Sequence, residues 1–180
     1  MKTIIASILV ALATTFTTSA AETVHLFLTA NGNDIEGEST QVSLGRANSI
    51  EAFAFQSEFF SPTDAGSGRP TGRRTYKPIT FTKRIDKSSP LLAKAFVNNE
   101  TIAGEIRFYR TDSNSGMIEH YYTIELQNAR VARVRNWTPS TIDPASVSSP
   151  DLEEVSLTFE TITWTDEESG NSTTDSTSDS

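Results

Sequence analysis

Polar and apolar residues alternate along most of this chain, which is the pattern of β-strands that bury one face. The alternating or apolar runs lie at 24–28, 49–56, 76–84, 101–110, 119–135 and 153–164. Turn-forming residues separate them, among them DSNSG at 112–116, which fits a hairpin turn. In SIEAFAFQ, 49–56, both faces are apolar, so we expect the core to cover one side and a partner the other. The pattern predicts a mainly β domain.

Two of these runs change phase partway. The apolar positions within 119–135 move from even to odd numbers along the run: Tyr122, Ile124, Leu126, Ala129 and Val131. Because a shift by one residue turns side chains to the other face, it predicts a β-bulge or a bend. The run 153–164 has a similar change between Phe159 and Ile162, and we interpret it as one last strand.

One segment in the middle departs from the alternation and reads as a helix. Its apolar residues recur at helical spacing and form one stripe: Leu91, Leu92, Ala95 and Phe96. We expect Ser89 to be the N-cap and Pro90 the first helical residue, where the missing N–H of proline costs no hydrogen bond. Asn98 and Asn99 suit the helix exit. A short helix in a β domain most simply plugs an open end or edge of a barrel or sandwich.

The segment SEFFSPTDAGSGRPTGRRT, 57–75, is a long loop with two prolines, three glycines and three arginines. Loops of this length are usually functional or disordered. Aromatic and arginine residues, which protein interfaces enrich, are concentrated in it: Phe59, Phe60, Arg69, Arg73 and Arg74. From these residues alone, a docking arm and a flexible insertion both remain open. A second long loop covers 136–150.

The two ends of the chain differ from its middle. Residues 1–20 place a lysine before an apolar run and then small residues, which is typical of a secretory signal peptide cleaved after Ala20 or Ala21. The run is too short for a permanent membrane anchor. We therefore expect a secreted or extracytoplasmic protein with no membrane contact after cleavage. Residues 166–180 are acidic and rich in Ser and Thr, and we expect a disordered tail.

The net charge limits the classes of partner, and the cysteine content limits the sources of stability. The formal net charge is −8 and no run of basic residues occurs. Because nucleic acids and anionic membrane surfaces need clustered Lys and Arg, we set both aside as partners. The chain has no cysteine, so its stability must come from the core and from assembly.

The sequence offers little catalytic chemistry. It has no Gly-x-Ser-x-Gly motif, no phosphate-binding glycine loop and no cysteine nucleophile. His25 and His120 sit in strand patterns, where a hydrogen-bonded sheet histidine is favoured over a catalytic base. Asp34, Glu36 and Glu38 are the one carboxylate cluster to test for calcium, although a solvated edge strand explains them better. We therefore predict no catalytic residue, no metal and no cofactor.

The segment FTKRIDKSSPL, Phe81 to Leu91, resembles the F-x-K-x-x-D-K-(S/A)-(S/T)-P-x-L segment of the Hcp family, the haemolysin-coregulated tube proteins of type VI secretion. Further segments follow in the family's order: DIEGES at 34–39, SIEAFAFQ at 49–56, YYTIELQNARVARVR at 121–135 and EEVSLTFETITW at 153–164. The resemblance spans 24–165, which is nearly all of the expected mature domain, 22–165.

The resemblance implies a mainly β fold: a two-sheet β-barrel with one short α-helix on its side. It implies a structural, non-catalytic protein that assembles with itself into hexameric rings with a wide channel. In the family these rings stack into a tube that a contractile sheath propels, and the lumen holds small effectors. The resemblance also favours the docking arm for 57–75, with Phe59, Phe60, Arg69, Arg73 and Arg74 as interface residues toward a subunit or ring.

Two features of the chain, its signal-like start and its acidic tail, depart from the family pattern. Family members that build the injection tube normally lack a signal peptide, so residues 1–20 point to an exported relative that forms rings without the contractile machine. The acidic tail is expected to repel a stacked ring.

Two other functions remain as alternatives. The first alternative is a monomeric secreted β-domain that binds a ligand or partner through 57–75 or the barrel end. The second, a secreted enzyme, has no visible catalytic constellation.

Overall fold

The structure, a computed structural model, describes residues 22–144, 146 and 148–177, so the predicted signal peptide lies outside the described residues. The elements, in chain order, are β1 (Thr23–Ala30), β2 (Asn33–Ile35), the 3-10 turn η1 (Ser43–Gly45), β3 (Ile50–Gln56), β4 (Phe59–Phe60), β5 (Thr75–Tyr76), β6 (Ile79–Arg84), α1 (Ser88–Val97), β7 (Ile102–Thr111), β8 (Ile118–Trp137), β9 (Leu152–Thr158), β10 (Thr161–Asp166) and β11 (Ser172–Ser176). None of the helices within these ranges is long and apolar enough to cross a membrane.

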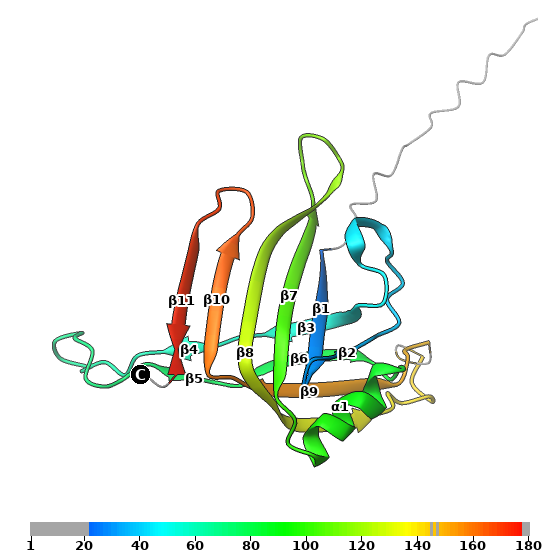
Figure 1. Ribbon diagram of the computed structural model, residues 1–180, viewed down its shortest axis with the longest axis horizontal. Coiled ribbons are helices and arrows are strands. Elements are labelled where there is room, and N and C mark those ends of the chain that lie inside the picture. Colours follow the sequence, from blue (N-terminus) through cyan, green and yellow to red (C-terminus); the bar gives the residue numbers. More distant parts are fainter. Residues whose placement is uncertain (1–21, 145, 147, 178–180) are drawn as a thin grey trace, which may run out of the picture.

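The strands close into a barrel of two layers. The antiparallel order β7-β1-β3-β6-β9 is closed by β8, which pairs with β7 along its first part and with β9 along its last. In one layer the strands β11, β10, β8, β7 and β1 stand upright, and β3, β6 and β9 cross beneath them (Figure 1). The expected mainly β barrel with one short helix is confirmed.

The long strand β8 bends where the sequence changes phase. Asn128 has a φ of 50°, and the register with β9 shifts between Val131 and Arg133. The bend lets β8 belong to both layers, because its residues before Asn128 pair with β10 and those after it pair with β9. The predicted bend is therefore confirmed, whereas the run 153–164 is two strands, β9 and β10, and not one.

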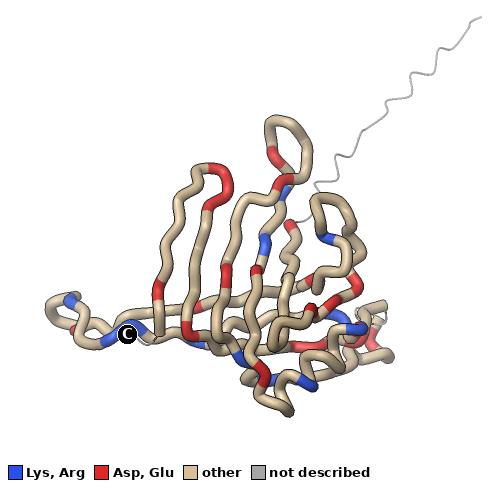
Figure 2. The backbone as a smooth tube through the Cα atoms, viewed as in Figure 1, with Lys and Arg blue, Asp and Glu red and all other residues tan. Residues whose placement is uncertain are grey.

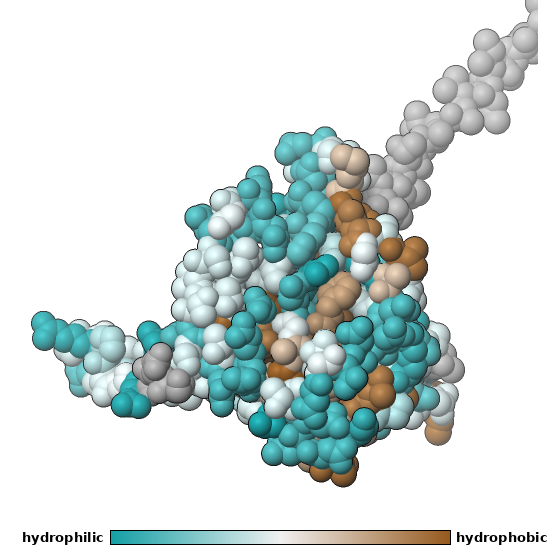
Figure 3. Space-filling view, viewed as in Figure 1, coloured by the Kyte–Doolittle hydropathy of each residue, from teal (hydrophilic) through white to brown (hydrophobic). Residues whose placement is uncertain are grey.

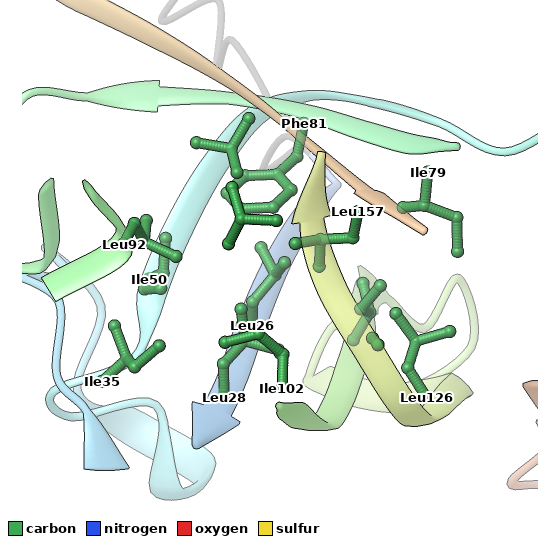
Figure 4. Packing of buried hydrophobic residues seen from close by; sticks show 14 of the residues in the cluster. Leu26, Leu28, Ile35, Ile50, Ile79, Phe81, Leu92, Ile102, Leu126 and Leu157 are labelled. Carbon is green, nitrogen blue, oxygen red and sulfur yellow. The ribbon is translucent and has the colours of Figure 1, made fainter. Parts of the chain in front are cut away.

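Apolar side chains from both layers meet inside the barrel. Residues of β1, β3, β6 and β9 point at one another, and Leu92 of α1 closes one end of this cluster (Figure 4). Leu26, Phe81 and Leu157 are fully buried. Burial at roughly 25 cal/mol per Å² of apolar surface makes this cluster the main stabilising element. Of the predicted helix stripe only Leu92 and Ala95 are buried; the other two residues are exposed.

The predicted helix cap is wrong by two residues. The helix begins at Ser88, its N-cap position is Lys87 without a side-chain cap, and Ser89 lies inside the first turn. The carboxylate of Asp86 accepts the hydrogen bond from the Ser88 N–H at 2.9 Å and so does the work assigned to Ser89. Pro90 is the third helical residue, still within the first turn, where its missing N–H costs no bond.

The predicted disordered tail is also wrong for the residues that the structure describes. Residues 172–176 form β11, which pairs with β10 from Thr161–Ser176 to Thr165–Ser172. Composition predicts disorder because the tail has little apolar surface to bury, but an existing sheet edge satisfies its backbone hydrogen bonds instead. Hydroxyl pairs across the two strands, such as Thr163 with Thr174 at 2.9 Å, add to the pairing. Residues 178–180 lie outside the described residues.

Candidate assembly surface

The segment 57–77, called the arm below, is an extended hairpin that projects from the barrel (Figure 1). At its base β4 pairs with β5, and further out Thr63 bridges Pro70. At the tip the Asp64 carboxylate accepts hydrogen bonds from the Ser67 hydroxyl at 2.8 Å and from backbone N–H groups, which lower its pKa. The segment therefore has the shape of an arm, while its docking role stays a prediction.

Aromatic rings fix the base of the arm on the end of the sheet. Phe59 lies 5.6 Å from the Tyr76 ring and 5.3 Å from the ring of Trp164 in β10. Tyr76 in turn meets Phe159 edge to face at 5.7 Å. Phe59 nevertheless keeps 54% of its surface exposed, and Phe60 keeps 45%. The base is thus anchored on one side and offers apolar surface on the other.

The C-terminal strand β11 holds the same base by charge. Arg74 Nη2 lies 2.9 Å from Asp175 Oδ1, and the Tyr76 hydroxyl donates a short hydrogen bond to the other carboxylate oxygen. Burial, and then Asp175, raises the pKa of Tyr76 to about 12, while the Tyr76 hydrogen bond lowers the pKa of Asp175. Asp175 was not among the predicted site residues because it lies in the tail predicted to be disordered; the adjacent Thr173 and Thr174, residues that favour strands, were the available signal.

The five predicted interface residues thus fall into two groups. Phe59, Phe60 and Arg74 lie at the base of the arm, and Phe59 and Arg74 contact the barrel strands. Arg69 and Arg73 lie on the exposed stretch beyond it. Figure 2 shows basic residues along the arm, and acidic residues on the β10–β11 turn at the end of that hairpin away from the arm. The arm therefore combines apolar and cationic surface, which is the mixture that interfaces enrich.

A buried ion cluster connects the helix start with two strands. Lys83 Nζ of β6 lies 2.7 Å from Asp86 Oδ1 and 3.0 Å from Glu153 Oε2 of β9, and both Lys83 and Glu153 are 1% exposed. Ser89 accepts from Lys83 at 2.9 Å and donates to Glu153 at 2.8 Å. Burial raises the pKa of Asp86, but hydrogen bonds from Lys83, Ser88 and a backbone N–H lower it overall. Three polar residues of FTKRIDKSSPL, namely Lys83, Asp86 and Ser89, thus hold the helix start against β6 and β9.

The two histidines are hydrogen-bonded within the sheet, as predicted. His25 is fully buried, its Nδ1 lies 2.8 Å from Ser49 Oγ, and burial together with Arg46 lowers its pKa to about 4. His120 Nε2 lies 2.9 Å from Thr123 Oγ1, and burial lowers its pKa. Across 22–177 as described, no three His, Cys, Asp or Glu residues are placed to hold a metal ion.

Comparison with known proteins relates this fold to one family. The family model described as "Type VI secretion system effector, Hcp" matches residues 27–165. The "Major exported protein" of Pseudomonas aeruginosa is 39% identical over 132 residues, which cover 73% of this chain and 76% of that protein. A crystal structure of an Hcp protein has a TM-score of 0.77 at 28% identity and covers 87% of this chain and 98% of its own.

A second solved structure agrees. A variant of the Hcp1 protein from E. coli EAEC 042 has a TM-score of 0.74 at 32% identity, with 87% of this chain and 99% of that chain covered. The family model covers residues 27–165, and both structural matches cover 87% of this chain. The chain therefore belongs to the Hcp family of type VI secretion proteins and has the structural role of that family.

Proposed function

We propose that this chain is a ring subunit that assembles as a homohexamer, and that its arm connects the ring to an adjacent ring in a tube. The arm carries this proposal: it extends away from the barrel and keeps two phenylalanines about half exposed. Phe53, on the strand predicted to face a partner, is also 47% exposed. Exposed aromatic residues beside arginines are typical of the central parts of interfaces.

We further propose that the protein acts outside the cytoplasm and carries small effectors or secretion partners, without catalysis of its own. The support is the relative described as a major exported protein and the signal-like residues 1–20. The partners of this chain would then be further copies of itself, components of a secretion machine and cargo in the ring channel.

Light scattering after gel filtration, with electron microscopy of the same fraction, tests the assembly. We expect rings of six subunits and, at higher protein concentration, stacks of rings. A variant with residues 63–70 replaced by two glycines removes the arm tip, and we expect single rings without stacks. Phe96→Ala, on the exposed side of α1, is the matched control and should still stack. A monomer at all concentrations would overturn the ring; stacks without the tip would overturn the role of the arm.

A further inference from the structure

A cavity of about 490 Å³ lies away from the arm, where the start of β1, strand β3 and the end of β7 meet. Its lining includes Arg46, Glu51, Phe53, Thr111 and Ile118. The region lies between η1 and the β7–β8 hairpin, where Figure 3 shows apolar surface. Its volume is within the range of small-molecule sites in proteins.

The floor of the cavity holds a buried cation. Arg46 is 1% exposed, and within residues 22–177 as described no carboxylate lies at ion-pair distance from its guanidinium. Its N–H groups donate to neutral oxygens only, to the Ser43 carbonyl at 2.9 Å, the Ser43 hydroxyl and the Thr23 hydroxyl at 3.4 Å. The guanidinium also lies over the Tyr109 ring, 4.8 Å from its centroid. Because buried charges are normally paired with an opposite charge, this guanidinium is suited to an external anion.

Two hydroxyls of the same lining, those of Tyr109 and Thr111, are also without a hydrogen-bond partner among the described residues. The Oγ1 atom of Thr111 is buried and has no hydrogen-bond partner among the described residues. Each buried polar atom left unpaired costs about 1–3 kcal/mol, so such atoms in a cavity indicate where a ligand oxygen fits. Arg46 and Thr111 together provide donors for one carboxylate.

Two other charged groups of the lining, Glu51 and Arg110, already have partners. The Glu51 carboxylate accepts from the Thr40 N–H at 3.0 Å and from the Thr40 hydroxyl at 2.8 Å. Arg110, also in the lining, lies 2.6 Å from Glu119. The apolar part of the wall includes Phe53, which is 47% exposed, and Ile118, which is 36% exposed; Glu22, Thr23 and Gln41 add polar groups. The cavity therefore offers a cation that has no ion pair, together with an apolar wall.

We propose that this cavity binds a single carboxylate attached to an apolar group, with the carboxylate at Arg46 and Thr111 and the apolar group against Phe53 and Ile118. The carboxylate has two possible sources, a small organic acid or the C-terminal residue of a polypeptide, and both present the same chemistry. Every residue of this site belongs to one chain, but Phe53 also lies on the strand expected to face a partner, so a ring subunit and the ligand would compete for this side chain.

Calorimetric titration of the full chain tests the charge requirement. The probes are 3-phenylpropanoate, its neutral amide, and a short peptide that ends in phenylalanine with a free or an amidated C-terminus. We expect each free carboxylate to bind at least about tenfold more tightly than its amide, since charge-assisted hydrogen bonds are lost in the amide. If only the peptide with a free C-terminus binds, the natural ligand is a polypeptide C-terminus. If 3-phenylpropanoate binds, the ligand is a small organic acid. Either result supports the proposal.

Two variants assign the contacts. Arg46→Gln should weaken carboxylate binding at least about tenfold, while Arg130→Gln, an exposed arginine elsewhere on β8, should leave it unchanged. Thr111→Val replaces the hydroxyl by a methyl group and keeps the shape of the side chain. It should therefore preserve or raise the Tm of the free chain while weakening carboxylate binding several-fold. This variant tests the proposal even if Arg46→Gln does not fold. Equal binding of acid and amide, no binding of any probe at millimolar concentration, or unchanged binding by Thr111→Val would overturn the proposal.

Discussion

The ion cluster at the helix start allows the strongest test of how this fold is stabilised. Lys83→Met replaces a buried ammonium by an apolar side chain of similar length. It leaves Glu153 and Asp86 without the cation that lies 3.0 Å and 2.7 Å from them. Ser89 still donates to Glu153, and Ser88 to Asp86, so the carboxylates keep hydrogen bonds but no positive charge.

The expected cost follows from the burial of the partners. Lys83 and Glu153 are each 1% exposed, and the Asp86 side chain 9%. Removal of one partner of such a buried pair costs about 3–5 kcal/mol, because the remaining charge cannot regain water. For a chain of this length each kcal/mol shifts the Tm by about 2–4 °C, so we expect a Tm lower by about 6–20 °C.

Urea denaturation followed by circular dichroism measures the change, at two protein concentrations because assembly adds to apparent stability. Lys94→Met is the matched control: Lys94 is 63% exposed and 3.8 Å from Glu100, so it should cost less than about 1 kcal/mol. The double variant Lys83→Met with Glu153→Gln should recover part of the loss. If Lys83→Met costs no more than the control, the cluster is hydrated and the reasoning fails.

Three further predictions concern other parts of the molecule. Asp175→Ala should leave stability within about 1 kcal/mol, because Arg74 is half exposed, but should speed hydrogen exchange and trypsin cleavage in the arm; unchanged exchange would contradict a role for β11 in holding it. His25 has a pKa of about 4 in the folded chain and about 6.5 unfolded, so its stability contribution is present above pH 6.5 and is lost toward pH 4, by up to about 3 kcal/mol; His25→Gln should show a correspondingly flatter profile of unfolding free energy against pH. Gly104→Ala should lower the Tm by several degrees or prevent folding, since φ is 151° and a Cβ would overlap the Phe27 carbonyl oxygen; a parental Tm would show that the strand can shift.

The alternation of side chains predicted most strands because one face of each packs into the barrel. The start of the helix was harder to predict. A serine before a proline is a good local cap. The Ser89 hydroxyl, however, is hydrogen-bonded to Lys83 and to Glu153, and Glu153 is far away in sequence. Asp86 therefore takes the capping role. A local rule fails here because a tertiary contact uses the same atom.

The two candidate sites also differ in whether a local sequence signal marks them. The composition of 57–75 left an arm and a flexible insertion both open, and the family resemblance favoured the arm. The cavity had no such signal: Arg46 becomes buried because η1 turns the chain with Leu44 at a φ of 55° and Gly45 at 73°. A single arginine in a polar stretch carries no information about burial, and only the fold brings it into the same cavity lining as Thr111.

The tail strand changes the expectation for stacking. As a disordered acidic segment, residues 166–180 were expected to repel a neighbouring ring. In the fold, Asp175 is paired with Arg74 at 2.9 Å, and Glu168 lies 3.5 Å from Arg110, so two of these charges are compensated within the chain. The same pairing fixes the arm base before any partner binds, and a pre-ordered arm loses less conformational freedom on association. In the assembly proposed above, β11 would lower both the charge repulsion between rings and the entropy cost of ordering the arm.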